Sequence, residues 1–369
     1  MRISMISTLP PIKGLTPYTL TLVKALAERV EIDFFGFKAL YPEFLYPGGT
    51  RTQDPEPVIP NVRIRNLLTW YNPFSWLWAG VSIRTDIVHA QWWSWFLAPV
   101  YLVVLAVARL RRKRVILTVH NVNPHERAWW KRVLNSSVLR LASEYIVHNE
   151  GNRELFLKET GTKKAVHVIP HPIIGIDGST VPRDELRSRY GYTQADRVVL
   201  YFGNIRDYKG LDVLIEAFAA LDNPESRLII AGRPWKNFDH YAHLIDKMGV
   251  GLTVKLFLEF ISNSQVAELF KLADVVVFPY KEFDASSGAG SLALQFEKAT
   301  VVTDVGGLPE LVSDPKLVVR PSDVRSLVGG ITYALNNQNR LEGEMVQLKE
   351  KFSPERIARM HLELYSTMP

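Results

Sequence analysis

The sequence has no cysteine among its 369 residues. Disulfides, thiolate nucleophiles and cysteine-based metal sites are therefore excluded. No Asp-x-Asp run is present either, so we expect no metal and no other cofactor. Residues 1–14 contain no apolar run long enough for a signal peptide, and we expect a cytoplasmic location.

Charge and tryptophan are distributed unevenly. Residues 1–180 hold 22 Lys and Arg against 13 Asp and Glu, whereas residues 181–369 hold 22 against 25. The basic half also holds eight of the nine tryptophans, which are Trp70, Trp76, Trp78, Trp92, Trp93, Trp95, Trp129 and Trp130. Indole rings beside cations suit the headgroup level of an anionic membrane surface, which is the predicted partner. Nucleic acid is not expected, because these aromatics lie in apolar runs rather than between basic residues.

The longest uncharged stretch covers residues 92–108 and is followed by RLRRKR at 109–114. At about 1.5 Å per residue such a helix reaches ~25 Å, short of the ~30 Å hydrocarbon core, and Pro99 interrupts it. We therefore expect that it does not span a membrane. Two interpretations stay open: an interfacial helix with a basic collar on anionic lipid, or a buried helix whose last turn carries cations.

Short apolar runs alternate with helical patterns along the whole chain. The runs are typical of strands buried on both faces of a parallel sheet. They cover residues 2–7, 31–37, 86–91, 115–119, 144–148, 165–170, 197–201, 227–231, 275–278 and 300–303, and residues 41–60 are predicted to form a loop. Because 169–180 is the best linker, we place one domain at 1–171, a second at 172–351 and a last helical segment at 352–369.

A Gly- and Ser-rich loop follows the predicted strand 275–278. It precedes a helical pattern over 291–298 and contains Asp284, Ser286, Ser287, Gly288 and Gly290. Backbone N–H groups and the positive end of a helix would meet there at the carboxyl edge of a sheet, where α/β proteins bind phosphates and sugars. An ordinary strand-to-helix connection explains this stretch equally well.

Three other loops carry candidate ligand contacts. Arg206 and Lys209 stand just before the helical pattern 211–221, where two cations and a helix dipole suit a diphosphate; two solvated loop charges are the alternative. His120 ends the strand 115–119 and could donate to a sugar hydroxyl, although a lone histidine is more often structural. Gly14 could let the backbone approach a phosphate, although one glycine more often marks a turn.

Over nearly its whole length the chain resembles the GT-B glycosyltransferases of the large retaining family 4. The likeness rests on the opening strand and loop with Gly14, and on DIVHAQ, TVHNVNPHE, FGNIRDYKGLDVLIEAF, LFKLADVVVFPY, TDVGGLPELV and FSPERIARMHLELY. It implies an α/β fold of two Rossmann-like domains facing each other across a cleft. By that resemblance the first domain binds the acceptor and faces the membrane, the second binds the nucleotide sugar, and the last helix packs back on the first.

The resemblance also suggests roles for individual residues. Lys209 matches the family's phosphate lysine, and Arg206 is expected to replace an arginine that falls on Asn204 here. His120 matches the histidine that the family places beside the donor sugar. Further matches next to the donor site are Gly306, Gly307 and Glu310.

The main departure from the family is its glutamate pair, E-x7-E. The two positions fall on Ala285 and Ala293, which carry no carboxylate. Glu282 and Asp284 lie near the first position, and Glu297 is expected one helical turn beyond the second, on the same face. The donor contacts must then come from these shifted residues or from the backbone around Ser286 to Gly290.

The resemblance implies transfer of a hexose, mannose or glucose, from GDP-mannose or UDP-glucose to a lipid-linked or saccharide acceptor. The enzyme would act peripherally at the inner face of the cell membrane, with retention of configuration. An epimerase or phosphorylase of the same fold and a non-catalytic partner subunit stay open as alternatives. The catalytic candidates are His120, Arg206 and Lys209, and the donor-binding candidates are Gly14, Asn204, Glu282, Asp284, Ser286, Ser287, Gly288, Gly290 and Glu297, with no metal ligand.

Overall fold

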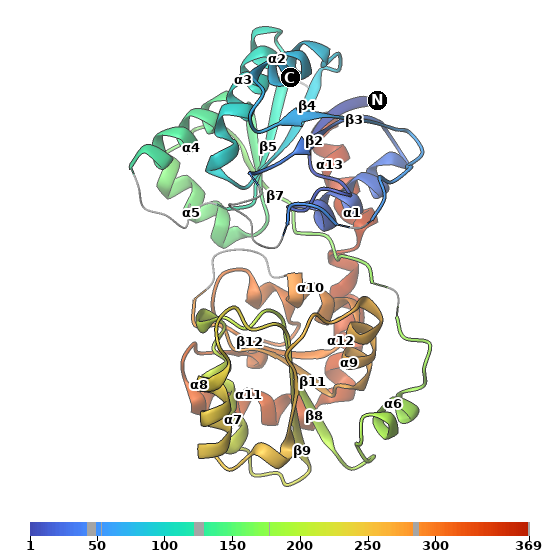
Figure 1. The fold of residues 1–369 in the computed structure, drawn as a ribbon, viewed down its shortest axis with the longest axis vertical. Coiled ribbons are helices and arrows are strands. Elements are labelled where there is room, and N and C mark those ends of the chain that lie inside the picture. The colour runs from blue at the N-terminus through green and yellow to red at the C-terminus, as the bar shows by residue number, and fades with distance from the viewer. Residues whose placement is uncertain (43–48, 53, 122–128, 177, 283–287, 368–369) are drawn as a thin grey trace. The chain divides into compact units, whose positions relative to one another are not determined.

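The chain divides into two compact units. The computed structural model describes residues 1–42, 49–52, 54–121, 129–176, 178–282 and 288–367. Unit 1 comprises Met1–Pro172 together with Phe352–Pro369, and unit 2 comprises Ile173–Lys351. Each unit has its own parallel sheet with helices on both faces (Figure 1). The predicted α/β fold is confirmed.

Unit 1 is built on a seven-stranded sheet in the order β3-β2-β1-β4-β5-β6-β7. Its strands are β1 (Arg2–Ser7), β2 (Glu31–Ala39), β3 (Val62–Thr69), β4 (Ile87–Trp92), β5 (Arg114–Val119), β6 (Glu144–Val147) and β7 (Val166–Val168). Its helices are α1 (Thr16–Ala27), α2 (Pro73–Ser82), α3 (Ala98–Leu110), α4 (Trp129–Leu141), α5 (Glu150–Thr160) and α13 (Pro354–Ser366). The chain runs outward from β1 to β3 and then returns to β4, so the strand order reverses between β1 and β4.

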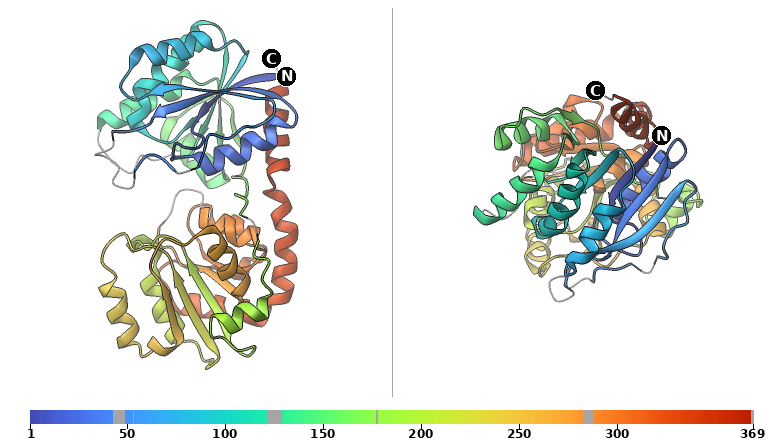
Figure 2. Two further views of the ribbon diagram at one scale, coloured as in Figure 1. Left: turned by 45° about the vertical axis from the view of Figure 1, so that its right-hand side comes forward. Right: turned by 90° about the horizontal axis from the view of Figure 1, so that it is seen from above.

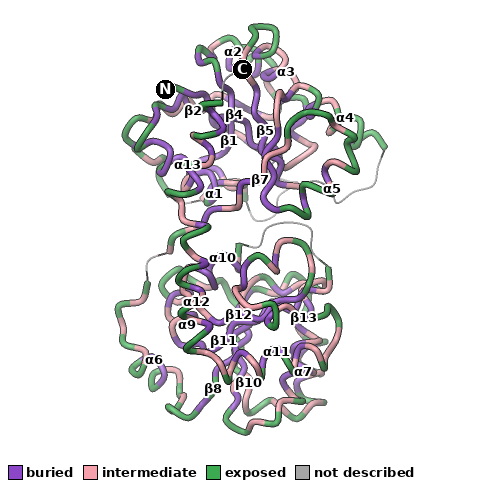
Figure 3. Tube along the Cα trace, turned by 180° about the vertical axis from the view of Figure 1, so that it is seen from behind, coloured by how far each residue is buried: buried purple, intermediate pink, exposed green. Residues whose placement is uncertain are grey.

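The strands of unit 1 are apolar on both faces because helices cover both faces. One apolar cluster contains Phe35, Val88 and Leu117 with the buried side of α3, and the other contains Ile3, Phe34 and Ile116 with α1 and α13. Figure 3 shows the strands as buried and the outer sides of the helices as exposed. Continuous apolar runs are therefore what this architecture requires.

The last helix of the chain belongs to unit 1. Ser353 accepts a hydrogen bond from the backbone N–H of Arg356, and Pro354 occupies the first turn, so α13 begins where the sequence signal predicts. The helix lies beside α1 and buries Ile357 and Tyr365 in the shared core (Figure 2). At its far end the Arg114 guanidinium donates to the carbonyl oxygen of Leu364.

The uncharged stretch after β4 is not one long helix. Trp92 ends β4, residues Trp95–Leu97 form a 3-10 turn, and α3 begins only at Ala98 with Pro99 in its first turn. Proline is compatible with that position, since the first N–H groups of a helix have no intrahelical partner, so Pro99 starts the helix rather than interrupting it. Tyr101 and Leu105 of α3 are fully buried in the core. The burial of this face supports the buried-helix interpretation of the stretch.

Unit 2 is built on a six-stranded sheet in the order β10-β9-β8-β11-β12-β13. Its strands are β8 (Arg197–Phe202), β9 (Ser226–Ala231), β10 (Val254–Phe257), β11 (Val275–Phe278), β12 (Ala299–Thr303) and β13 (Val318–Val319). Its helices are α6 (Arg183–Arg189), α7 (Leu211–Ala219), α8 (Asp239–Lys247), α9 (Asn263–Leu272), α10 (Gly288–Gln295), α11 (Val324–Asn336) and α12 (Gln338–Lys351). The strand order reverses between β8 and β11, which places the loops after these two strands at the topological switch point.

Candidate functional site

Two loops of unit 2 lie against each other at the switch point. The backbone N–H of Lys281, after β11, donates to the carbonyl oxygen of Tyr208, after β8, at 2.7 Å. Gly210 has φ +68°, and a Cβ there would stand 2.0 Å from the carbonyl oxygen of Pro279. The close approach of the two backbones therefore requires glycine at this position.

Lys209 brings an ammonium group to the start of α10. It ends a 3-10 turn, Asp207–Lys209, and its Nζ lies 4.9 Å from the ring centroid of Tyr280. A Cβ built on Gly203 would stand 3.1 Å from this Nζ and 3.6 Å from the Cβ of Ala289, in the first turn of α10. The ammonium group and the positive end of the α10 dipole thus face the same space, which is suited to an anion.

The charge of Lys209 has no carboxylate partner among the residues that the structure describes. Burial lowers the pKa of this ammonium group, while nearby Tyr208 raises it and nearby Arg206 lowers it. A half-buried cation without a counter-ion is poised to gain from an anionic ligand, because the ligand would supply the charge that the protein does not.

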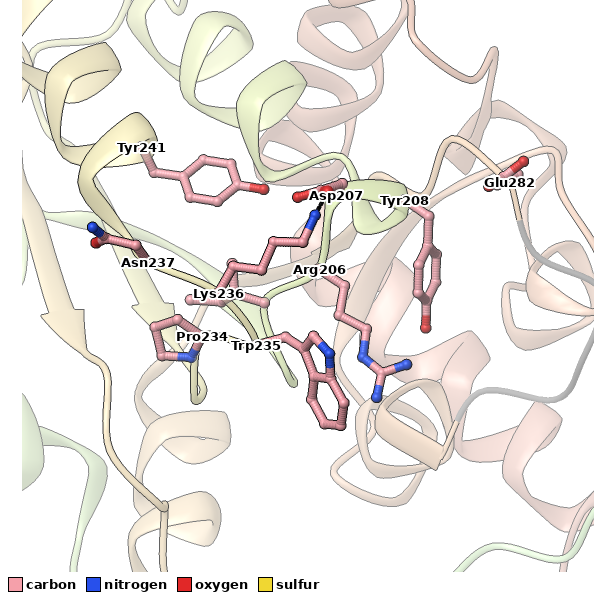
Figure 4. Close-up of a pocket in the computed structure, with 10 residues that line it drawn as sticks. Arg206, Asp207, Tyr208, Pro234, Trp235, Lys236, Asn237, Tyr241 and Glu282 are labelled. Atoms are coloured by element: carbon pink, nitrogen blue, oxygen red, sulfur yellow. Dashed lines mark hydrogen bonds and ion pairs between the residues drawn. The ribbon is translucent and has the colours of Figure 1, made fainter. Parts of the chain in front are cut away.

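Arg206 lies in a neighbouring pocket of about 310 Å³. Its guanidinium carbon is 4.2 Å from the ring centroid of Trp235, and Figure 4 shows the two side chains lying face to face. The Nε of Arg206 is buried and has no hydrogen-bond partner in the described structure. Tyr208 and Glu282 line the same pocket. The volume is within the usual range of small-molecule sites, and the protein leaves one hydrogen-bond donor of the Arg206 guanidinium unused.

An exposed ion pair lines this pocket. Lys236 Nζ lies 2.8 Å from Asp207 Oδ2, and the hydrogen bond from Lys236 lowers the pKa of that carboxyl. Asp207 is thereby engaged with Lys236 rather than with Arg206 or Lys209. The arrangement leaves two cations, one on each side of Tyr208, to meet an incoming diphosphate.

The other donor-binding candidates of unit 2 fall into three groups. Asn204 is exposed on the loop after β8, and Gly288 and Gly290 belong to the first turn of α10. Asp284, Ser286 and Ser287 lie outside the described residues. Trp235 and Tyr280, which contact the two cations, were not predicted from the sequence. Both follow strands, which is the signal that could have identified them.

Glu297 is not at this site. The helix α10 ends at Gln295, two residues before it, and Glu297 has φ +55° at the turn that leads into β12. Its carboxylate is 2.7 Å from Lys349 Nζ of α12. Because α10 runs from the carboxyl edge of β11 to the amino end of β12, this ion pair lies at the opposite edge of the sheet. The expectation that Glu297 replaces a family glutamate is therefore wrong.

Unit 1 carries the remaining two candidates at the carboxyl edge of its own sheet. Gly14 is exposed after β1 with φ +103°, and a Cβ there would meet Thr8 and Leu40 at 3.3 to 3.4 Å. His120 follows β5 and is buried, and both its ring nitrogens are engaged: Nε2 lies 2.8 Å from Gln91 Oε1 and Nδ1 lies 3.1 Å from His148 Nε2. Burial, and then the neighbouring histidines, lower the pKa of His120 well below its ordinary value. It is a neutral imidazole within a polar cluster.

The described residues contain neither a metal site nor a membrane span. No three of their His, Cys, Asp or Glu side chains are grouped so as to hold a metal ion. None of the described helices has the length and apolar character needed to cross a bilayer.

Known proteins resemble this chain in both sequence and structure. Residues 12–174 match the family described as Glycosyltransferase Family 4, and residues 182–351 match the family described as Glycosyl transferases group 1. The D-inositol 3-phosphate glycosyltransferase of Mycolicibacterium smegmatis is 27% identical over 345 residues, covering 82% of this chain and 73% of that protein. The protein of the same name from Mycobacterium tuberculosis is 26% identical over 338 residues, covering 82% of this chain and 66% of that protein.

Solved structures of other proteins have the same fold as this chain. The sucrose-phosphate synthase of Thermosynechococcus elongatus superimposes with a TM-score of 0.71 at 19% identity, covering 99% of this chain and 98% of that one. HepE of Anabaena, in complex with UDP, has a TM-score of 0.73 at 17% identity over 100% of both chains. At these identities the likeness shows the fold. The two family matches, the curated relatives and the two parallel sheets together show that the chain belongs to the GT-B glycosyltransferases of the family 4 type, which are transferases that use nucleotide sugars.

Proposed function

We propose that this enzyme transfers a hexose, mannose or glucose, from a nucleotide diphosphate sugar to a hydroxyl of a lipid-linked or glycan acceptor at a membrane surface, with retention. One observation carries the proposal. Lys209 lies beside the first turn of α10 and Arg206 lies on the same loop against Trp235, both at the switch point of unit 2, and neither cation has a carboxylate partner among the described residues. This is a binding site for a diphosphate.

The same two cations account for the chemistry. An acceptor hydroxyl attacks the anomeric carbon while the bond from that carbon to the diphosphate oxygen breaks. The leaving diphosphate takes the hydroxyl proton, and Lys209 and Arg206 stabilise the negative charge that remains on it. Removing one such contact typically costs ~3 kcal/mol of barrier, or roughly a hundredfold in rate. We propose that these cations do the work of a metal ion, so that transfer proceeds without one.

Retention without a protein nucleophile requires attack on the face from which the diphosphate leaves. The described part of α10 carries no carboxylate, which supports this route over a covalent intermediate. Mass spectrometry of enzyme quenched during turnover tests the choice. A sugar adduct on Asp284 or Glu282 would contradict front-face attack.

The donor remains to be assigned between GDP-mannose and UDP-glucose. HepE is described in complexes with UDP and with UDP-glucose, which supports the uridine nucleotide, whereas the sequence resemblance favours GDP-mannose. The curated relatives are named for an inositol phosphate acceptor, which supports a phosphorylated, hydroxyl-rich acceptor head. Such a head would suit a lipid-linked acceptor held at a bilayer surface.

Helix α2 supports the membrane part of the proposal. Four of its apolar side chains, spaced as one helical face, are exposed: Phe74 (83%), Leu77 (50%), Trp78 (65%) and Val81 (53%). The basic end of α3 lies beside it, because Arg111 Nη1 donates to the carbonyl oxygens of Val81 and Ile83 at 2.7 and 2.6 Å. The exposed Arg84 follows α2 two residues after its end. An apolar helix face edged by cations fits an anionic lipid surface.

Vesicle sedimentation tests the membrane part. Wild type should bind vesicles containing anionic lipid and lose binding as salt rises, and Phe74→Ser with Trp78→Ser should abolish binding to both neutral and anionic vesicles. Leu252→Ser is the matched control, since Leu252 of unit 2 is fully exposed and lies outside the α2 face. Equal binding by the double variant and wild type would contradict a lipid role for α2.

Transfer itself is tested with labelled GDP-mannose and UDP-glucose and a lipid extract as acceptor. Lys209→Ala should lose roughly a hundredfold in rate. Lys316→Ala is the control. Lys316 precedes β13, away from the switch point, and its Nζ makes a similar contact, 5.0 Å from the ring centroid of Tyr333 on α11. Equal loss in both variants, or no transfer by wild type with any donor, would contradict the proposal. The anomeric configuration of the product, read by NMR, decides retention.

A further inference from the structure

Unit 1 contains a continuous row of buried polar side chains that ends at a backbone carbonyl. It joins α13, three strands and the segment after β7. In order, the contacts are Tyr365 OH to His89 Nδ1 (2.6 Å), His89 Nε2 to the Gln91 amide (3.2 Å), the Gln91 amide to His120 Nε2 (2.8 Å), His120 Nδ1 to His148 Nε2 (3.1 Å), and His148 Nδ1 to the carbonyl oxygen of Ile169 (3.0 Å). The five side chains are buried.

The carbonyl at one end fixes the proton positions at the next two rings. A carbonyl oxygen only accepts, so His148 must carry its proton on Nδ1. A neutral imidazole has one N–H, which leaves His148 Nε2 as an acceptor, and His120 must then donate from Nδ1. By the same rule His120 Nε2 carries no proton and accepts.

The remaining contacts follow from His120. Its bare Nε2 requires a donor, whereas the structure places Gln91 Oε1 against His120 and Gln91 Nε2 against His89. The oxygen and nitrogen of a glutamine amide are assigned from their hydrogen bonds, so the Gln91 amide is turned by 180°, with its NH2 group toward His120 and its oxygen toward His89. His89 then donates from Nε2, to the Gln91 oxygen or to Thr118 Oγ1 at 2.7 Å. Its Nδ1 accepts from the Tyr365 hydroxyl. Every donor in the row meets an acceptor, and all run in one direction.

The surroundings favour neutral rings throughout. Aromatic groups face the cluster: the Tyr18 ring lies 4.7 Å from His120 and 5.4 Å from His148, and His171 lies 5.5 Å from His148. On the α13 side the His361 ring lies 5.4 Å from His89. Among the described residues no carboxylate contacts the rings of the row. Burial lowers the pKa of His148 to about 3, so a doubly protonated ring, which would be needed to reverse the direction, is not populated at neutral pH.

We infer that His148 is a positioning residue that holds His120 as the Nδ1–H tautomer, so that His120 meets a hydroxyl only as an acceptor, through Nε2. A sugar hydroxyl engages this nitrogen by replacing the Gln91 NH2 group. The sequence had suggested that His120 donates to the sugar, and the row of contacts reverses that role. The inference rests on the proposed function and on the family resemblance, by which His120 lies beside the donor sugar.

The tautomers are read directly by NMR of protein labelled with 15N-histidine, since a bare and a protonated ring nitrogen resonate far apart. The chain has nine histidines, so single substitutions assign the signals. At neutral pH we expect Nδ1–H for His120 and His148 and Nε2–H for His89. This measurement needs no substrate and no functional variant.

Kinetics test the positioning role. His148→Leu removes the acceptor of the His120 proton, so the Nε2–H tautomer of His120 should appear and kcat should fall about tenfold, the value of one hydrogen bond, with little change in donor KM. His148→Gln keeps an acceptor at the same reach and should restore both tautomer and kcat. His167→Gln is the control, because His167 lies on β7 and contacts Glu144 rather than this row.

Two results would overturn the inference. The first is an Nε2–H or doubly protonated His120 in the wild-type spectrum, and this result is decisive even if His148→Leu does not fold. The second is a folded His148→Leu in which His120 shifts to the Nε2–H tautomer while kcat is unchanged. Wild type that transfers no sugar would instead refute the proposed function, and the spectrum would still decide the tautomer.

Discussion

Acid should destabilise unit 1 at pH values where carboxylates do not yet titrate. Burial is the main cause that lowers the pKa of His148 to about 3 and that of His361 to about 4. In the unfolded chain both have a pKa of about 6.5. The unfolded state therefore binds more protons, so the stability from these neutral rings is complete above about pH 6.5 and is lost as pH falls toward 4.

The size of the effect follows from that difference. Each buried neutral histidine costs about 1.4 kcal/mol per pH unit below the unfolded pKa, which comes to about 2 kcal/mol between pH 7 and pH 5. His148 and His361 together should remove ~4 kcal/mol over this range, a large part of the 5–15 kcal/mol typical of a domain. The carboxyls with lowered pKa, such as Glu144, contribute only at lower pH.

Urea unfolding followed by tryptophan fluorescence measures this loss for unit 1, since eight of the nine tryptophans lie there. His361 offers the sharpest variant, because its Nε2 is buried and has no hydrogen-bond partner in the described structure. His361→Leu should reduce the loss between pH 7 and pH 5 by about 2 kcal/mol without lowering stability at pH 7. Met360→Leu on the same helix changes packing but removes no titrating group.

Two results would refute this reasoning. If wild type is equally stable at pH 7 and pH 5, the histidines are not held neutral in the native state. If His361→Leu and Met360→Leu lose the same free energy as wild type over this range, the proton uptake does not come from His361.

Three further predictions concern unit 2. Arg206→Lys keeps the charge but loses the planar contact with Trp235, so nucleotide diphosphate affinity should fall about tenfold by calorimetry, and unchanged affinity would remove Arg206 from the site. Gly210→Ala places a Cβ 2.0 Å from the Pro279 carbonyl oxygen and should destabilise unit 2 by more than about 1 kcal/mol in urea; an unchanged midpoint would contradict the close approach. Glu297→Gln should leave donor KM unchanged, since its partner is on α12, and a tenfold rise would return Glu297 to the site.

The alternation of apolar runs predicted most of the fold, because parallel strands covered on both faces require such runs. Strands β1 and β11 begin and end at the predicted residues. Strand β3 was missed because it lies at the edge of its sheet. Its Arg63 is exposed and Arg65 is half-buried, which breaks the continuous apolar pattern.

The two cations of the site could be predicted because they lie three residues apart on one loop. Their partners could not, since Trp235 and Tyr280 reach them from the loops after other strands. The same holds for Gln91 and His148, which meet His120 only because β4, β5 and β6 pair in a register that aligns their carboxyl ends. Glu297 was misplaced because the sequence does not show that α10 begins three residues earlier than predicted and ends before it.

Equilibrium binding of nucleotides to wild type and Lys209→Ala is the most direct test of the account, which holds that the switch point of unit 2 binds a diphosphate. A thermal-shift panel would compare GDP, UDP, GDP-mannose, UDP-glucose and UDP-GlcNAc, with Lys316→Ala as control. Either the guanosine or the uridine nucleotides, at a hundredfold excess over their dissociation constant, should stabilise wild type and the control by ~2.7 kcal/mol and leave Lys209→Ala nearly unchanged. Equal stabilisation of all three proteins, or of none, would contradict it.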